Sequence, residues 1–533
     1  MAQSMSRPRK DVLIEDFSKA SFFHAASKRY YEMRWKYGRL LFRRYQLDAR
    51  GAQINVFERK VDWIIGSGHR ARVYLYQAPD GELFQLPVAW YTQEHAWGMA
   101  PGYDGPDHDG VERPVRRECL FCHDAYVEMP AGSDAHWAPQ IFPRDLPEGT
   151  GCQRCHGPGA RHVLAALAGE SDDAVRAAIV NPAKLPPARR DSVCFQCHLL
   201  PAVAMPGVRR FDRGDESFRP GELLSDYLLH VEPHEPGRQA SDRFEINHHA
   251  YRLQQSLCYQ KGGITCITCH DPHVSLSKDK RLANVRNVCL GCHEKAHFGD
   301  RRSAGDCVAC HMPRRRTQDV VHVVMTDHRI ERHPPPGDLL APLAEREPVI
   351  DGVTLFDRGV LPDGPLADAY RAVAVLRAQP RSQPALDALS KALASIEHPP
   401  ETALIDLAAG QLRHRRYAGA VKTIARMRED EPQRPGLTAI AEAGLGHTEQ
   451  AAEDLHKAIE AQPRVPELHA DLGILLHRLG KEDEALTELS RAVELRPDFV
   501  VALVARSRVL RALGRAKEAQ QDMLRARAVH PAL

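Results

Sequence analysis

The sequence predicts a multidomain protein with a small β-rich N-terminal module, a central region of loops and short helices, and a C-terminal all-α solenoid. Three observations support this fold class. The chain has 533 residues, which is too many for a single hydrophobic core. All 13 cysteines lie between Cys119 and Cys310. Beyond them the sequence is rich in Ala, Leu, Arg and Glu and repeats with a period of 34 residues.

Residues 1–118 contain no cysteine and are predicted to form the β-rich module. β-Branched and aromatic residues, which favour strands, are frequent in the stretches 36–47, 52–65, 70–77 and 82–91. The sequence APDGE at 78–82 predicts a hairpin turn between the last two stretches. The sequence WGMAPGYD at 97–104 is expected to form a loop broken by Gly and Pro.

Twelve of the cysteines belong to six C-x-x-C-H motifs, and Cys258 is the one left over. This motif is typical of covalent c-type haem attachment, because two thiols bond the haem vinyl groups and the adjacent histidine binds the iron. A zinc knuckle, a redox dithiol and structural disulfides are alternatives, but none of them requires a histidine directly after the second cysteine. The motifs therefore predict six covalently bound haem c groups.

The haem-binding residues follow directly from the motifs. The thiols are Cys119, Cys122, Cys152, Cys155, Cys194, Cys197, Cys266, Cys269, Cys289, Cys292, Cys307 and Cys310. The proximal iron ligands are His123, His156, His198, His270, His293 and His311. Only 18 residues separate His270 from Cys289 and 13 separate His293 from Cys307, too few for an ordinary apolar core. Residues 119–332 are thus predicted to be a hexahaem cytochrome c domain of loops and short helices.

Histidine is also the expected second iron ligand, because the chain has 28 His and only 10 Met. The stronger candidates for distal ligands are His162, His249, His273 and His328. For three further candidates a surface or structural role competes equally, and these are His69, His322 and His95.

A Pro-rich linker is expected at 333–366, followed by tetratricopeptide (TPR) repeats at 367–533. Gly446, Gly480 and Gly514 are spaced 34 residues apart, and a set of Ala and Pro positions keeps the same spacing. Small Ala residues let two helices approach each other, and Gly opens the turn between them. About five helix pairs are expected, and an unrelated helical bundle is the alternative.

These residues resemble the multihaem c-type cytochromes with C-terminal TPR repeats. The haem-binding region is similar to the tetrahaem cytochromes that take electrons from hydroxylamine oxidoreductase. The resemblance spans roughly 55–332 and rests on IGSGHRARVYL, WGMAPGYD, ECLFCHDAY, GCQRCHGPGARHV, NHHAYRLQQS, TCHDPH and DCVACHMPRRRTQDVVHVVMTDHRI. It implies that His162, His249, His273 and His328 are distal ligands, and it favours the same role for His69 and His322.

Such proteins are exported, and family members usually begin with a signal peptide and a further C-x-x-C-H motif. This chain opens with MAQSMSRPRKDVLIEDF, which has no apolar signal core, and it has no apolar run of about 18 residues that could span a membrane. We therefore expect a periplasmic or extracellular protein whose true start codon and signal peptide lie upstream of Met1.

The function expected from these observations is electron transfer along six bis-His haems, with redox partner proteins docking through the TPR region. Lys and Arg number 72 against 70 Asp and Glu, so the charge gives no reason to expect a nucleic-acid partner. The alternative is a multihaem oxidoreductase that acts on a small nitrogen or sulfur compound at one open iron. No catalytic residue is assigned, although the unpaired thiol of Cys258 is available for such chemistry.

Overall fold

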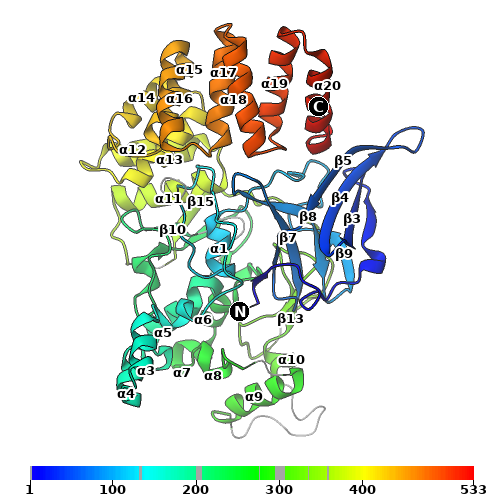
Figure 1. Ribbon diagram of the computed structural model, residues 1–533. Coiled ribbons are helices and arrows are strands. Elements are labelled where there is room, and N and C mark those ends of the chain that lie inside the picture. The colour runs from blue at the N-terminus through cyan, green and yellow to red at the C-terminus, as the bar shows by residue number, and fades with distance from the viewer. Residues whose placement is uncertain are drawn as a thin grey trace.

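The computed structural model describes residues 3–130, 135–199, 207–274, 277–293, 307–333, 335–356 and 359–533. Figure 1 shows a helical solenoid above two other parts, a pair of β-sheets and a region of short helices. The sheets lie beneath the C-terminal end of the solenoid, and most of the short helices lie beneath its first helices. Two of them, Lys278–Leu290 and Cys307–His311, lie at the bottom of Figure 1, below the sheets. The C-x-x-C-H motifs belong to this region of short helices.

Two antiparallel sheets form the N-terminal module. One has the strand order β2-β3-β4-β5 and the other β1-β6-β7-β8-β9. Their bounds are β1 Met5–Ser6, β2 Ser21–His24, β3 Arg29–Lys36, β4 Arg39–Leu47, β5 Gln53–Lys60, β6 Trp63–Ile65, β7 Ala71–Gln77, β8 Leu83–Tyr91 and β9 Ala96–Met99. The strands expected from the sequence are present, and the APDGE turn joins the antiparallel pair β7 and β8.

The loop expected at 97–104 is only partly present, which corrects that prediction. Trp97 pairs with Trp90 in the β8–β9 ladder, so the first residues of this stretch continue the sheet. The two indole rings meet edge to face with centroids 5.5 Å apart, and such aromatic contacts between neighbouring strands stabilise the pair. The chain leaves the sheet at Pro101 and Gly102, where Gly102 has a φ of +80° that favours glycine.

The central region consists of short elements, none longer than the 13 residues of α9 among the residues described. Its helices are α1 Arg117–His123, α2 Gln153–His156, α3 Ala160–Leu167, α4 Asp172–Ala177, α5 Pro187–His198, α6 His249–Gln254, α7 Leu257–Gly262, α8 Cys266–Cys269, α9 Lys278–Leu290 and α10 Cys307–His311. Its strands are β10 Val208–Arg209, β11 Leu228–Leu229, β12 Val231–His234, β13 Arg314–Arg316 and β14 Val324–Thr326.

Part of the segment expected as a linker is packed rather than free. Gly352–Leu355 form β15, which pairs antiparallel with β12 of the central region. Ile350, Val353 and Leu355 are buried in the same hydrophobic cluster as the first solenoid helices. The alternation of apolar and polar residues in this short strand buries one face, and this overrides the Pro-rich character of the preceding residues.

Ten helices in five antiparallel pairs form the solenoid. They are α11 Pro365–Ala378, α12 Gln383–Ala394, α13 Glu401–Arg413, α14 Tyr417–Ile424, α15 Arg434–Leu445, α16 Thr448–Ala461, α17 Pro466–Arg478, α18 Glu482–Leu495, α19 Val500–Ala512 and α20 Ala516–Val529. The first helices of successive pairs touch each other, as α13 touches α15 and α17 touches α19, so they form the inner row. Gly446, Gly480 and Gly514 adopt positive φ in the turns within pairs, as the repeat predicts.

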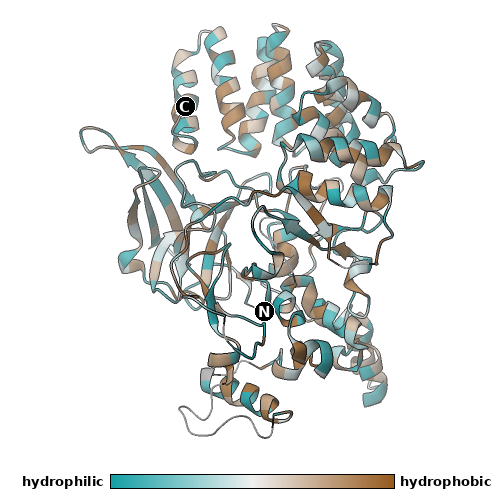
Figure 2. Ribbon diagram, turned by 180° about the vertical axis from the view of Figure 1, so that it is seen from behind, coloured by the Kyte–Doolittle hydropathy of each residue, from teal (hydrophilic) through white to brown (hydrophobic). Residues whose placement is uncertain are grey.

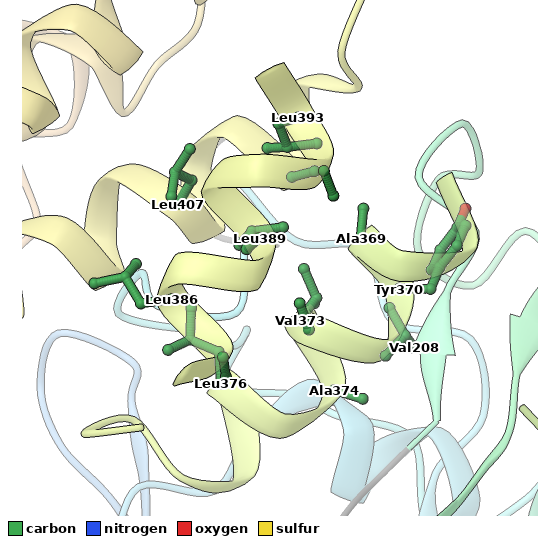
Figure 3. Packing of buried hydrophobic residues seen from close by; sticks show 14 of the residues in the cluster. Val208, Ala369, Tyr370, Val373, Ala374, Leu376, Leu386, Leu389, Leu393 and Leu407 are labelled. Carbon is green, nitrogen blue, oxygen red and sulfur yellow. The ribbon is translucent and has the colours of Figure 1, made fainter. Parts of the chain in front are cut away.

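Apolar residues on facing helices form the solenoid core. Figure 3 shows Val373 and Leu376 of α11 packed against Leu386, Leu389 and Leu393 of α12. The solenoid helices carry hydrophobic and hydrophilic residues side by side, as amphipathic helices do (Figure 2). No helix in the described ranges has the length and apolar character needed to cross a membrane.

Buried polar contacts join the solenoid to the sheets. Arg496, in the turn between α18 and α19, pairs with Asp80 at 3.0 Å, with Glu82, and with Glu467 at 2.7 Å. The Tyr76 hydroxyl donates to Asp498 at 2.9 Å, and Arg44 of β4 donates to the Val529 carbonyl at 2.9 Å. These contacts fix the lower edge of the solenoid on the β-module, because each buried charge needs its partner.

Replacing Arg496 with Met is expected to lower the free energy of unfolding by about 3–5 kcal/mol, because the buried carboxylates of Asp80 and Glu82 would lose their shared cation. Urea unfolding followed by circular dichroism measures this change. Arg491→Met is the matched control, since Arg491 forms only an exposed pair with Glu494, which is worth at most about 1 kcal/mol. Equal losses in the two variants would contradict the role given to Arg496.

Candidate haem-binding site

Short helices position the C-x-x-C-H residues. Helix α1 ends at His123, α5 ends at His198, and α10 comprises Cys307–His311. Residues three and four positions apart share one face of a helix, so the two thiols and the imidazole of a motif point to the same side. None of the 13 cysteines, all of which lie in the described ranges, forms a disulfide.

Backbone carbonyls hold three of the proximal imidazoles by Nδ1. His156 Nδ1 lies 2.8 Å from the Val180 oxygen, His311 Nδ1 lies 2.7 Å from the Glu331 oxygen, and His123 Nδ1 lies 3.3 Å from the Ser4 oxygen. An imidazole that donates from Nδ1 presents an unprotonated Nε2, which is the atom that binds a metal. The tautomer needed for iron binding is therefore set by the fold around these residues.

Two of the distal candidates are held in the same way. His162 Nδ1 lies 2.8 Å from the Val175 oxygen, and His328 Nδ1 lies 3.1 Å from the Thr326 oxygen. The acceptors are the backbone carbonyl groups of Val175 and Thr326, whose side chains are not haem ligands. Sequence analysis missed them, because no residue type marks a backbone acceptor.

Three motif histidines lie beside a distal candidate. The ring centroids of His156 and His273 are 5.8 Å apart, and those of His270 and His328 are 6.2 Å apart. Metal–imidazole bonds of about 2 Å on opposite sides of one ion place two ring centroids about 6 Å apart. Both pairs therefore have the separation that one iron between them requires.

The third pair is His198 and His249, with centroids 5.2 Å apart and nearly perpendicular rings. Neither Nδ1 atom of this pair has a hydrogen-bond partner, although both are buried. The His249 ring also lies 4.7 Å from that of His328, so four histidines form a continuous row. A metal ion bound at Nε2 would leave the cost of each buried Nδ1 in place, so only the closeness of the two rings supports this pair.

Burial keeps these histidines neutral. It lowers the pKa of His198 and His328 to about 4 and that of His249 well below the ordinary value, and the neighbouring histidines add to the effect. Burial also lowers the pKa of His270. Only a neutral imidazole binds a metal, so the environment favours the binding form at physiological pH.

Thiols of different motifs approach each other. Cys122 lies close enough to Cys197 for each thiol to shift the pKa of the other, and the same holds for Cys194 and Cys266. Cys307 likewise helps to raise the pKa of Cys289. The neighbouring thiol lowers the pKa of Cys122 and raises that of Cys197. The first and third motifs, the third and fourth, and the fifth and sixth are therefore neighbours in space.

The remaining distal candidates lie elsewhere. His69 and His95 are exposed on the β-module, and His95 lies in the turn between β8 and β9. His322 packs on Tyr91 and lies 3.4 Å from the Asp104 carboxylate, whose hydrogen bond raises the pKa of His322. The structure does not bring these three together with a motif histidine among the residues described.

Ring distance alone does not identify a ligand. The centroids of His24 and His108 are 6.1 Å apart, close to the spacing of the motif pairs. However, both nitrogens of His108 are engaged, by the Gly110 N–H and by the Tyr31 hydroxyl. The motif pairs differ because each contains a C-x-x-C-H histidine. Their donor set, with paired thiols and neutral imidazoles, fits haem c.

Comparison with known proteins identifies two regions of the chain. A family profile described as tetratricopeptide repeat matches residues 442–506, and one described as doubled CXXCH motif matches residues 258–298. No curated protein matches the chain. The paired motif indicates covalently bound c-type haem, which suggests an extracytoplasmic location, and the TPR match indicates a protein-interaction region.

Solved structures that resemble the chain cover about a third of it. MamA is 15% identical with a TM-score of 0.27, and the match covers 30% of this chain and 95% of MamA. MamA AMB-1 is 20% identical with a TM-score of 0.27, covering 30% and 96%. YrrB, described as a TPR protein with an unusual peptide-binding site, is 18% identical with a TM-score of 0.26, covering 32% and 87%.

The double variant Cys152→Ala/Cys155→Ala is expected to carry one haem fewer than the parent protein, because the second motif would lose both attachment thiols. Intact-protein mass spectrometry of the purified holoprotein counts the haems. Cys258→Ala is the matched control and is expected to leave the haem count unchanged, since Cys258 lies outside every motif. An unchanged count in the double variant would contradict covalent attachment at this motif.

Proposed function

We propose that the chain carries electrons through six covalently bound haem c groups, each with two histidine ligands. The observation that carries this proposal is the pairing of motif histidines with second histidines: His156 with His273, His198 with His249, and His270 with His328. Iron with both axial positions filled by protein suits electron transfer, because neither position is left for a substrate.

Bound haem c supplies reversible one-electron oxidation and reduction of its iron. The residues of this chain hold the ligands in place for that chemistry. The carbonyls of Val180 and Thr326 orient His156 and His328 through Nδ1, and such second contacts raise ligand basicity. Burial around the row of histidines excludes water, which favours a stable, unchanging coordination during electron transfer.

The approach of thiols from different motifs supports electron movement from haem to haem. Cys122 with Cys197 and Cys194 with Cys266 link the first, third and fourth motifs. The Cys258 thiol lies close enough to influence both Cys269 and Cys289, so the fourth and fifth motifs are also near neighbours. Porphyrins bonded to adjacent thiols have adjacent edges, and short edge separations favour fast electron transfer.

The setting of this function is part of the proposal. The chain would work in the periplasm or outside the cell, where c-type haem is attached, and would exchange electrons with redox partner proteins that dock on the TPR region. The relation to tetrahaem cytochromes linked to hydroxylamine oxidoreductase rests on the sequence motifs alone.

Single Ala variants of His249, His273 and His328 are each expected to convert about one haem from low spin to high spin, because one iron would lose its sixth ligand. Low-temperature EPR of the oxidised holoprotein, normalised to the haem count, measures this change. His456→Ala is the control, since His456 is exposed on α16 of the solenoid. It is expected to leave the spectrum unchanged.

The EPR spectrum of the parent protein also distinguishes a carrier from an enzyme. Only low-spin signals are expected for an electron carrier with every iron six-coordinate. A high-spin signal of about one haem equivalent in the parent would instead support an oxidoreductase with one open iron. Unchanged spectra in all three variants would contradict the pairing of ligands.

A further inference from the structure

The chain itself occupies the beginning of the solenoid's inner face. The Trp137 indole N–H donates to Asp406 of α13 at 2.9 Å, and the Arg413 guanidinium lies 4.1 Å above the Trp137 ring. Ile141, which is 7% exposed, joins a hydrophobic cluster with Ala439 of α15. Residues 135–142 thus run along the inner row, and residues 137–140 leave a space between themselves and helices α15 and α17.

A cavity of about 370 Å³ remains between residues 137–140 and these two helices. We call it the α15–α17 groove. Its floor is apolar, with Leu437, Ile440 and Leu468, and Ile440 is 42% exposed. Gly436 widens the groove, because a Cβ at this position would lie only 3.3 Å from the Leu468 side chain. A cavity of this size accommodates a few side chains of another chain.

One wall of the groove is acidic. Glu467 and Asp471 are four residues apart on α17, so they project from the same face of the helix. The Glu467 Oε1 atom pairs with Arg496, but Arg496 also serves Asp80 and Glu82. The Glu467 Oε2 atom is buried without a hydrogen-bond partner.

Asp471 has neither a hydrogen bond nor an ion pair among the described residues. Burial raises the pKa of Asp471 to about 6. Burial and the charges of Asp80 and Asp471 raise that of Glu467 to about 8. The cation that lines the groove, Arg116, donates to the His136 carbonyl and lies 6.0 Å from the Trp137 ring. Asp471 therefore has no counter-ion in the described part of the chain, and Glu467 shares its one cation, Arg496, with Asp80 and Glu82.

We propose that the α15–α17 groove binds an extended segment of a redox partner protein through a Lys or Arg side chain beside an apolar one. The cation would contact Asp471 and the free oxygen of Glu467, and the apolar side chain would cover Ile440. The identification of the partner as a redox protein rests on the proposed function. An acidic segment is disfavoured, because it would bury further carboxylates beside Asp471 and Glu467 without supplying a cation. No three metal-ligating side chains gather in the described ranges to favour a metal ion instead.

Selection of phage-displayed random peptides on the full-length holoprotein tests the proposal. Peptides with Lys or Arg next to an apolar residue are expected to be enriched. For the synthesised best peptide, Glu467→Gln/Asp471→Asn is expected to weaken binding tenfold or more, about the loss expected for charged hydrogen bonds. Glu494→Gln on α18 is the matched control, since its side chain is exposed and outside the groove, and it should leave binding unchanged.

Gly436→Leu provides a second test, because the added side chain would fill the groove without changing its charge. It is expected to abolish binding of the selected peptide. The proposal is overturned if no peptide is enriched, if acidic or uncharged peptides are enriched, or if both groove variants bind like the parent. It is also overturned if the parent forms a dimer that the double variant disrupts in sedimentation analysis, since the occupant is then a second copy. The EPR spectrum and haem count of the same samples report separately on electron transfer, so the two proposals can fail independently.

Discussion

The shortness of the segments between the C-x-x-C-H motifs is the constraint on which the rest of the structure depends. Helices such as α8, of four residues, cannot form a continuous apolar core by themselves. The cluster around the motifs is small and includes Phe121, Phe195 and Phe218 together with motif cysteines. Stability must therefore come from covalently attached haem within the region and from the larger cores on either side.

The flanking regions supply those cores and join them through buried polar contacts. β12 of the central region pairs with β15, and both bury apolar residues against α11 of the solenoid. On the other side, Arg496 and Asp498 connect the solenoid to the sheets. A buried ion pair adds little net stability compared with apolar packing, but it strongly disfavours separation, because each charge would be left unpaired. The solenoid is thus part of the scaffold as well as a surface for partners.

Much of this arrangement could be predicted from the sequence, and the exceptions have physical reasons. The spacing of motif residues and the 34-residue repeat are local patterns, so the attachment thiols and the helix pairs followed from them. His249, His273 and His328 were candidates by position, but that they lie beside His198, His156 and His270 is visible only in the three-dimensional structure. Pairings between distant residues depend on the path of loops that carry no strong pattern.

Sequence analysis missed several features because no particular type of side chain indicates them. The carbonyl acceptors of Val180 and Glu331 orient ligands through backbone atoms, which every residue has. β15 lies in a Pro-rich segment, and its pairing with β12 depends on a contact across more than a hundred residues. His322 matched a family motif, yet in the fold Asp104 engages it.

The groove and the first motif are physically connected, so the proposed docking site would border the proposed path of electrons. Arg116 lines the α15–α17 groove and is also the residue that precedes helix α1, the helix that carries Cys119 and Cys122. Glu118, the second residue of α1, pairs with His136 at 2.8 Å. Trp137, which follows His136 in the chain, donates a hydrogen bond to Asp406 of the solenoid. A partner segment bound in the groove would therefore lie beside the first motif. Cys122 lies near Cys197, and Cys194 lies near Cys266, so the third and fourth motifs follow the first in space. If the proposed electron transfer and the proposed docking both hold, the first motif would be the site of electron exchange with the docked protein.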